Sequence, residues 1–134
     1  MDIKKFIIIA DDNKLIAKVL SNKLTAAGYE VVIAENGEEA TQAVIARMPD
    51  LLLMDLIMPV KDGFAALREL RANPATKDVK VIVTSDLQQS EDVEKIKQLG
   101  ALGLFDKANL QEIVDIIPQL VYSSAPPTNE KGDA

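Results

Sequence analysis

Short blocks of hydrophobic residues recur along this chain, and each predicts a buried strand. The blocks cover residues 6–9, Glu30–Ala34 and residues 51–54, 79–83 and 103–105. Three of them are almost continuously apolar, which is typical of strands that are covered on both faces of a sheet. After each block, apolar residues recur at three- or four-residue spacing, which indicates an amphipathic helix.

Five helices are therefore expected, one after each strand. The first has Ile16, Val19, Leu20, Leu24 and Ala27 on its inner face and ends at Gly28; the second turns Ala40, Ala43, Val44 and Met48 inward and ends before Pro49. The remaining three inner faces are expected at Phe64, Leu67 and Leu70, at Val93, Ile96 and Leu99, and at Leu110, Ile113, Val114, Ile117 and Val121. Pro118 is expected to kink or loosen the last helix.

Strict alternation of strands and helices predicts an α/β fold, a (βα)5 doubly wound parallel sheet between two helix layers. Right-handed crossovers leave few topologies, and we expect the flavodoxin-like strand order 2-1-3-4-5. Residues 1–122 are expected to form one domain. Residues 123–134 have almost nothing to bury and are expected to be a disordered tail.

Composition narrows the chemistry. The net charge is −6, with 21 acidic and 15 basic residues, which argues against direct binding of a nucleic-acid backbone. The chain has no histidine and no cysteine, so Ser–His–Asp and Cys–His catalysis, thiolate metal sites and a phosphohistidine on this chain are excluded. No signal-peptide layout and no apolar run long enough for a bilayer is present, so no membrane contact is expected and a cytoplasmic location fits.

Polar side chains gather where the predicted strands end. In an open parallel sheet, sites form outside the carboxyl ends of the strands. The residues at these ends are Asp11, Asp12, Asp55, Thr84, Ser85, Asp106 and Lys107. Crowded carboxylates repel one another, and Mg²⁺ relieves this repulsion while it leaves coordination positions open for phosphate oxygens.

This set contains the parts that phosphoryl transfer requires. Asp55 is the candidate nucleophile, Asp11 and Asp12 would hold Mg²⁺ beside it, and Lys107 would stabilise developing charge. Thr84 would donate a hydrogen bond to the attached phosphoryl group. Taken singly, each residue is more simply interpreted as a helix cap, a loop residue or a solvated lysine. Capping alone does not explain why four strand ends carry this combination.

The same residues give the chain its resemblance to the receiver domain of two-component response regulators, over about residues 4–122. The matching features are Asp11–Asp12, the segment 51–63 (LLLMDLIMPVKDG), Thr84, Gly100–Ala101 and Lys107. The resemblance implies that Asp55 is phosphorylated and that Asp12, Asp55 and the backbone carbonyl of Ile57 bind Mg²⁺, with Asp11 acting through water. It also implies that Thr84 is the switch hydroxyl and that Lys107 pairs with the phosphoryl group.

Three features depart from the family pattern. Leu104 occupies the position where an aromatic residue usually partners the switch threonine, and Phe105 is expected to face the opposite side of its strand. Ala108 replaces the proline that usually follows the lysine, so a trans peptide bond is expected. Ile57 and Asp86 border the approach of water to the phosphoryl group and are expected to tune its lifetime.

We therefore expect a stand-alone receiver that is phosphorylated by a histidine kinase, a histidine phosphotransfer protein or a small phosphodonor. Its output would pass by contact to an unknown protein target, because no further domain follows residue 122. Slow self-catalysed phosphorylation and dephosphorylation are expected, although the domain is not an enzyme in purpose. The main alternative is a pseudo-receiver that binds partners without phosphorylation.

Two other classes fit less well. A Mg²⁺-dependent phosphatase with an aspartyl nucleophile usually has a second acid two residues later, where this chain has Ile57. A dinucleotide-binding domain needs a glycine-rich turn after the first strand, where this chain has Asp11-Asp12-Asn13.

Overall fold

A computed structural model of the chain describes residues 3–85 and 90–122. Its sheet has five strands in the order β2-β1-β3-β4-β5, and every neighbouring pair is parallel. The strands are β1 (Phe6–Ala10), β2 (Glu30–Ala34), β3 (Leu51–Asp55), β4 (Val81–Ser85) and β5 (Leu104–Asp106). The predicted fold class and strand order are confirmed.

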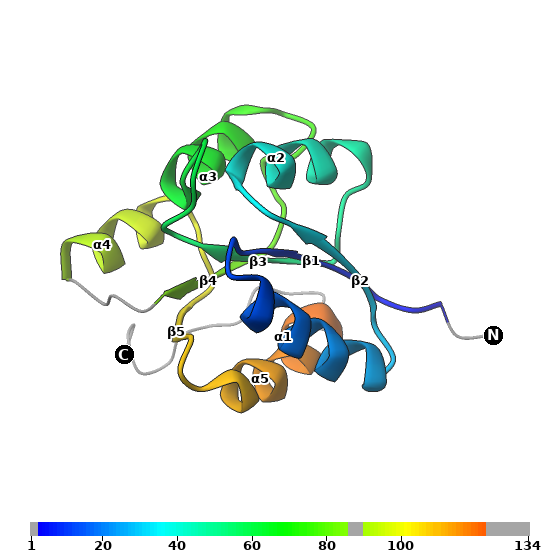
Figure 1. Ribbon diagram of the computed structural model, residues 1–134. Helices are drawn as coiled ribbons and strands as arrows, with labels where there is room; N and C mark the ends of the chain where they lie inside the picture. Colours follow the sequence, from blue (N-terminus) through cyan, green and yellow to red (C-terminus); the bar gives the residue numbers. More distant parts are fainter. Residues whose placement is uncertain (1–2, 86–89, 123–134) are drawn as a thin grey trace.

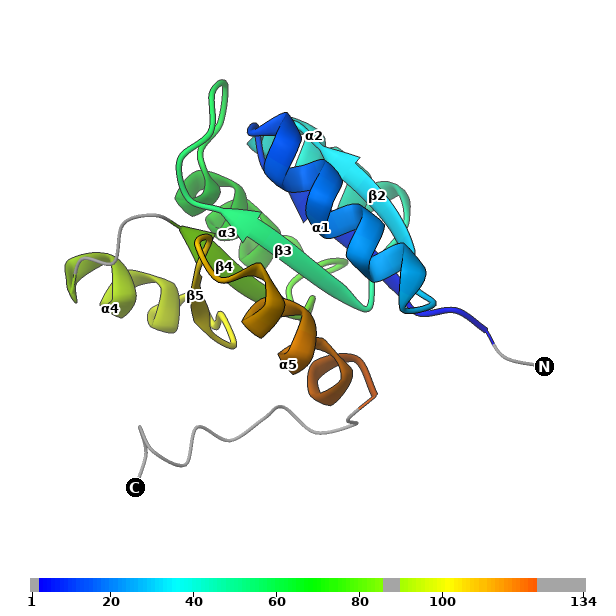
Figure 2. The same cartoon turned by 60° about the horizontal axis from the view of Figure 1, so that its bottom comes forward.

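A helix follows each strand, and the helices cover both faces of the sheet (Figure 1). They are α1 (Lys14–Ala26), α2 (Gly37–Ala46), α3 (Gly63–Ala72), α4 (Ser90–Gln98) and α5 (Leu110–Tyr122). Figure 1 shows α2 and α3 on one side of the sheet and α1 and α5 on the other. Seen from the second direction, α1 and α5 lie together in front of the sheet (Figure 2).

Two apolar clusters fill the space between the sheet and the helices. Ile8, Leu52 and Val83 point to the side of α2, α3 and α4, where they pack with Val44, Leu67 and Ile96. Alternate residues of the same strands point to α1 and α5, where the other cluster includes Ile9, Leu53, Leu24 and Ile117. Both faces of the central strands are therefore buried, which explains their nearly continuous hydrophobic sequence.

Side-chain caps fix the helix starts near the carboxyl edge of the sheet. Asn13 accepts hydrogen bonds from the backbone N–H groups of Leu15 and Ile16, both at 3.1 Å. Asn36 and Asp62 cap α2 and α3 in the same way. Each cap satisfies donors that the first helical turn leaves unpaired. Gly28, with φ of +99°, provides the left-handed turn after α1.

Some predicted positions were wrong. Met48 is not in the core, because α2 ends at Ala46 and an extended Arg47 takes the chain off the helix, leaving Met48 45% exposed. Ala17 is one of the α1 residues that lie in the core, whereas Ile16 and Val19 are only half-buried. Strand β4 begins at Val81 and not at residue 79, because the Val79 N–H turns back to the Thr76 carbonyl at 3.0 Å.

The helix α5 continues through Pro118 to Tyr122. The predicted tail, residues 123–134, and Asp86 lie outside the described residues. None of the helices in residues 3–85 and 90–122 combines the length and hydrophobicity that a bilayer span requires.

Candidate functional site

Three buried charged side chains meet at the carboxyl edge of the sheet. Lys107, just after β5, places its Nζ 3.0 Å from Asp11 Oδ2 and 3.1 Å from Asp55 Oδ2. Asp11 follows β1 and Asp55 ends β3, so the parallel topology brings together residues that are far apart in sequence. Asp11 and Asp55 are each 4% exposed and Lys107 is 8% exposed, so the ammonium bridges the two carboxylates away from solvent.

The electrostatics of this trio follow from burial and short contacts. Burial raises the pKa of Asp55; Lys107 lowers it and Asp11 raises it further, and the net pKa lies above that of an ordinary carboxyl. Burial alone would lower the pKa of Lys107, but hydrogen bonds and charge from Asp11 and Asp55 raise it overall. The raised pKa of Lys107 favours its ammonium form, and the raised pKa of Asp55 means that Lys107 compensates its carboxylate only in part, so a further cation beside it would favour the charged form.

Asp12 completes an acidic cluster suited to a hard divalent cation. One carboxylate oxygen from each of Asp11, Asp12 and Asp55 lies within 4.8 Å of the others. Asp12 is exposed, whereas the other two are buried, so an ion would be reached from the solvent side. An all-oxygen donor set with one open side fits Mg²⁺, which keeps part of its hydration shell in proteins.

The hydroxyl residues of β4 lie beside this cluster. Thr84 is in register with Asp55 on the neighbouring strand and is 5% exposed. Ser85 pairs in register with Asp106 and, by strand alternation, faces the other side of the sheet. Thr84 is thus the hydroxyl residue whose strand position matches that of Asp55.

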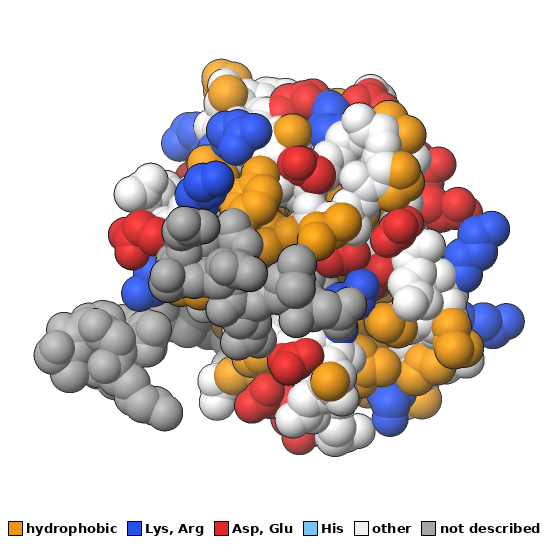
Figure 3. All heavy atoms as spheres, turned by 60° about the vertical axis from the view of Figure 1, so that its left-hand side comes forward, with side chains coloured by type: hydrophobic (Ala, Val, Ile, Leu, Met, Phe, Trp, Pro, Cys, Tyr) orange, Lys and Arg blue, Asp and Glu red, His pale blue; other side chains and the backbone are white. Residues whose placement is uncertain are grey.

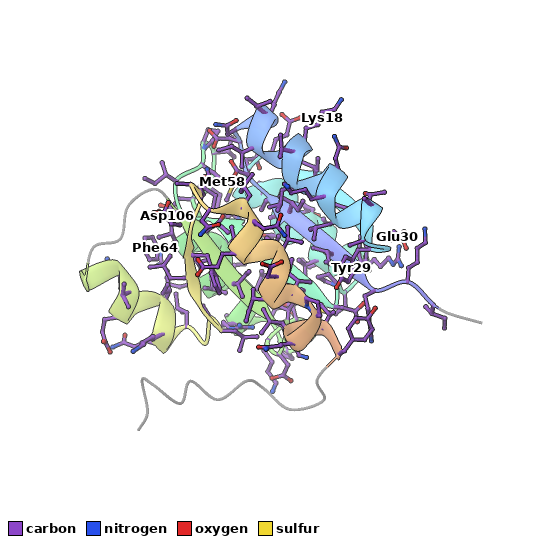
Figure 4. All side chains as sticks on the ribbon, turned by 90° about the horizontal axis from the view of Figure 1, so that it is seen from below. Lys18, Tyr29, Glu30, Met58, Phe64 and Asp106 are labelled. Atoms are coloured by element: carbon purple, nitrogen blue, oxygen red, sulfur yellow. The ribbon has the colours of Figure 1, made fainter. Side chains whose placement is uncertain are left out.

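Asp106 does not join the cluster, although it too stands at a strand end. Its side chain is exposed, and its Oδ1 accepts a hydrogen bond from the Ala108 N–H at 2.9 Å. Figure 4 shows Asp106 and Met58 at the end of the molecule opposite Tyr29 and Glu30, as expected for the carboxyl edge. Asp106 therefore shapes the turn after β5 and leaves the interior position to Lys107.

The loop after β3 borders the site (Figure 2). Ile57, in this loop, is 61% exposed, and its N–H lies 3.5 Å from Asp55 Oδ1. Sequence reasoning missed Lys61, which forms ion pairs with Glu38 of α2 and Glu69 of α3. The three charges come from two helices and the loop before one of them and share no local spacing pattern, so only the fold identifies them as partners.

The expected departures around β5 are confirmed. Leu104 packs against the cluster on the side of α2, α3 and α4, whereas Phe105 packs against the cluster on the side of α1 and α5. Phe105 therefore cannot replace an aromatic residue at position 104. The peptide bonds of the described residues, including the Lys107–Ala108 bond, are all trans.

A doubly wound five-stranded sheet with a lysine bridging two buried aspartates at its carboxyl edge defines a class of phospho-accepting signalling domains. The family described as "Response regulator receiver domain" matches residues 7–118. The chain belongs to this family.

Relatives in sequence are longer regulatory proteins. A probable transcriptional regulator, ycf27, from Guillardia theta is 35% identical over 101 residues, which are 75% of this chain and 39% of the relative. The response regulator PleD from Caulobacter vibrioides is also 35% identical over 101 residues, 75% of this chain and 22% of that protein. The chain thus matches less than half the length of these relatives.

Solved structures share the fold over almost the whole chain. The receiver domain of the Francisella response regulator 1452 superposes with a TM-score of 0.80 at 26% identity and covers 89% of this chain and 98% of that one. The phosphorylated cyanobacterial phytochrome response regulator RcpA has a TM-score of 0.81 at 28% identity, with 92% and 97% covered.

Proposed function

We propose that this receiver accepts a phosphoryl group on Asp55, in a Mg²⁺-dependent reaction with a phosphohistidine of a separate protein. The observation that carries the proposal is the Lys107 ammonium, which contacts both Asp11 and Asp55 in a buried site. The phosphorylated state of the similar regulator RcpA supports the same chemistry here. A histidine kinase or a histidine phosphotransfer protein would be the donor, because this chain has no histidine.

The residues divide the work of phosphoryl transfer. A carboxylate oxygen of Asp55 forms the new bond to phosphorus, while the phosphorus–nitrogen bond of the donor breaks and its electron pair leaves with the imidazole. Bound Mg²⁺ would neutralise the acidic cluster and the phosphoryl oxygens. Asp11, Asp12, Asp55 and the backbone carbonyl of Ile57 are the proposed residues of the metal site. Lys107 is already beside Asp55 and follows the negative charge as it moves onto the phosphoryl group.

Thr84 would couple phosphorylation of Asp55 to a conformational change. Its place in register with Asp55 puts its hydroxyl on the strand next to the acceptor. A hydrogen bond from this hydroxyl to the phosphoryl group would favour one arrangement of the chain after β4, including α4, over another. Ile57 and Asp86 would tune the phosphoryl lifetime.

Residues 1–122 would form the receiver unit, with residues 123–134 as a tail outside it. We propose that a protein target reads the phosphorylated state, without direct contact of this unit to nucleic acid or membrane. The net charge of −6 opposes a phosphate backbone. On the described part of the face in Figure 3, acidic and basic side chains are interspersed and do not gather into a basic band.

The decisive test is the intact mass after incubation with acetyl phosphate, a small donor on which the domain must act by itself. We expect one phosphoryl adduct that requires Mg²⁺, disappears with a chelator and is absent from Asp55→Asn. Loss of the adduct over time would report self-catalysed dephosphorylation. If the wild-type protein acquires no adduct and binds no Mg²⁺, the chain is a pseudo-receiver with constitutive binding.

A further inference from the structure

The loop between β3 and α3 is closed tightly against Asp55. The Gly63 N–H donates to the Leu56 carbonyl at 2.9 Å, which joins the two ends of the loop. A Cβ at Gly63 would lie 2.3 Å from the backbone oxygen of Asp55, so only glycine permits this approach. The base of the loop is therefore fixed, and Ile57 lies just inside it.

The tip of the same loop has a strained backbone. Val60 has φ of 70°, and the Lys61 N–H bonds to the Pro59 carbonyl at 2.7 Å across it, which is the pattern of a γ-turn. Positive φ is costly for a β-branched residue. The Val60 side chain is 82% exposed, so its own packing does not compensate. Neighbouring contacts must hold this conformation.

Lys61 makes those contacts, and it makes them to two helices. Its Nζ lies 2.8 Å from Glu38 Oε1 at the start of α2 and forms a second ion pair with Glu69 of α3. Its carbonyl accepts a hydrogen bond from the Gly37 N–H at 2.9 Å. A Cβ at Gly37 would lie 2.1 Å from that carbonyl oxygen, so α2 also approaches the loop through a glycine.

We propose that Lys61 is a positioning residue for the metal and phosphoryl site. By tying the strained loop tip to Glu38 and Glu69, Lys61 keeps the Ile57 main chain in the place from which its carbonyl reaches the metal. This inference rests on the proposed function, because it assigns the loop a part in Mg²⁺ binding. Lys61 would act through the loop, without contact to the metal or the phosphoryl group.

Positioning and simple electrostatics predict opposite signs for Lys61→Met. Removal of a cation makes the protein more negative, which by charge alone tightens Mg²⁺ binding. Loss of positioning weakens it, because the carbonyl of Ile57 is no longer held. We expect binding about tenfold weaker, at the low end of the loss caused by removing an outer-shell partner.

The experiment is a titration with MgCl₂ at constant ionic strength, followed by amide NMR shifts of wild type, Lys61→Met, Lys61→Arg and the control Lys77→Met. Lys77 is an exposed lysine whose ion-pair partner is its neighbour Asp78. Lys61→Arg, which keeps both ion pairs, and Lys77→Met are expected to bind like wild type. Lys61→Met should also lose the strong intraresidue HN–Hα NOE of Val60 that marks positive φ.

A second variant guards against misfolding of Lys61→Met. Glu38→Gln with Glu69→Gln keeps the lysine, removes both partners and is expected to weaken Mg²⁺ binding similarly. Unchanged or tighter binding in Lys61→Met, with the Val60 NOE intact, would overturn the role of Lys61 and leave the proposed function standing. A wild-type protein that binds no Mg²⁺ would overturn both.

Discussion

Val60 has a positive φ of 70° although it is β-branched and 82% exposed. Glycine adopts this φ without strain, at the expense of some additional freedom in the unfolded chain. We expect Val60→Gly to raise the free energy of unfolding by up to about 1 kcal/mol, because relief of strain exceeds that entropy. Urea denaturation measures the difference.

The matched control for this change is Val60→Ala. Alanine keeps a Cβ, so most of the strain at positive φ remains and the gain in stability is expected to be smaller than with glycine. A Val60→Gly protein no more stable than Val60→Ala would show that the turn stores little strain.

The charge of Asp55 gives the metal-free protein a characteristic pH dependence. Burial is the main reason why the pKa of Asp55 is raised in the folded state. Lys107 lowers this pKa, and Asp11 raises it further. The exposed Asp12 belongs to the same acidic cluster. The protonated form is favoured on folding, so this contribution to stability is present below about pH 4 and is lost as pH rises through the folded pKa.

In chelator, Asp55→Asn should therefore be more stable than wild type at pH 8 and should lose that advantage as the pH falls toward about 4. Thermal unfolding midpoints measured at both pH values provide the test. Saturating Mg²⁺ should reduce the difference at pH 8, because the ion compensates the carboxylate. If the unfolding midpoints of the two proteins change in parallel with pH, the raised pKa of Asp55 is wrong.

Arg71 joins three elements through backbone carbonyls. Its guanidinium donates to Leu99 at 2.7 Å and Gly100 at 3.3 Å at the end of α4, and to Lys77 at 2.8 Å and Val79 at 2.7 Å before β4. A cation at a helix C-terminus also interacts favourably with the helix dipole. The end of α4 is therefore held to α3 and to the start of β4.

We expect Arg71→Met to reduce the free energy of unfolding by about 2 kcal/mol, because four backbone carbonyls, those of Leu99 and Val79 part-buried, lose a charged donor at once. Urea denaturation gives the loss, and hydrogen exchange should localise it to the amides of Leu99, Gly100 and Ala101. Arg68→Met is the control, since Arg68 is exposed on the same helix, and it should change stability by less than about 0.5 kcal/mol. If both variants lose the same stability, the hydrogen bonds of Arg71 to the carbonyls are not the cause of the loss.

The existence and order of the strands and helices could be predicted, because the hydrophobic blocks of the strands are strong and alternate regularly with amphipathic helix patterns. Strand β2 coincides with the predicted Glu30–Ala34, whereas β1, β3, β4 and β5 each extend beyond the predicted end. The added residues are small or polar, and all except the exposed Asp106 are buried: Ala10, Asp55, Thr84, Ser85 and Asp106. A hydrophobicity pattern cannot recognise a polar strand residue that is buried because it belongs to the functional site.

The location of the candidate site could also be predicted, but not all of its contacts. Topology alone brings Asp11, Asp55 and Lys107 to one edge, because parallel strands all end there. Topology alone did not show that Asp106, which ends β5 next to Lys107, stays outside the cluster; its exposure becomes visible only in the fold. The ion pairs of Lys61 with Glu38 and Glu69 depend on how α2 and α3 pack, and no local sequence pattern encodes this packing.

At the scale of the whole molecule, the site and α4 are connected through β4. Thr84 lies in register with Asp55, and α4 is the next helix along the chain. Ile96 of α4 packs in the same cluster as Val83 of β4 and Leu104 of β5. Because Arg71 holds the other end of α4, a change at Thr84 is expected to act mainly on the end of α4 that follows β4.

Thr84→Ala tests this connection. The variant should still form the Asp55 adduct with acetyl phosphate and Mg²⁺, because the nucleophile and Lys107 remain. It should lose the phosphorylation-dependent change in hydrogen exchange that we expect in α4 and β5 of the wild-type protein, since the methyl group cannot donate to the phosphoryl oxygens.

Ser85→Ala removes the neighbouring hydroxyl, which belongs to a buried residue of the same strand but faces the other side of the sheet. It should keep both the adduct and the exchange response. A response that survives in Thr84→Ala would show that the phosphoryl group acts on α4 by another route. In that case Leu104, which replaces the usual aromatic partner, would mark a chain in which the threonine switch has been lost while the acceptor chemistry is retained.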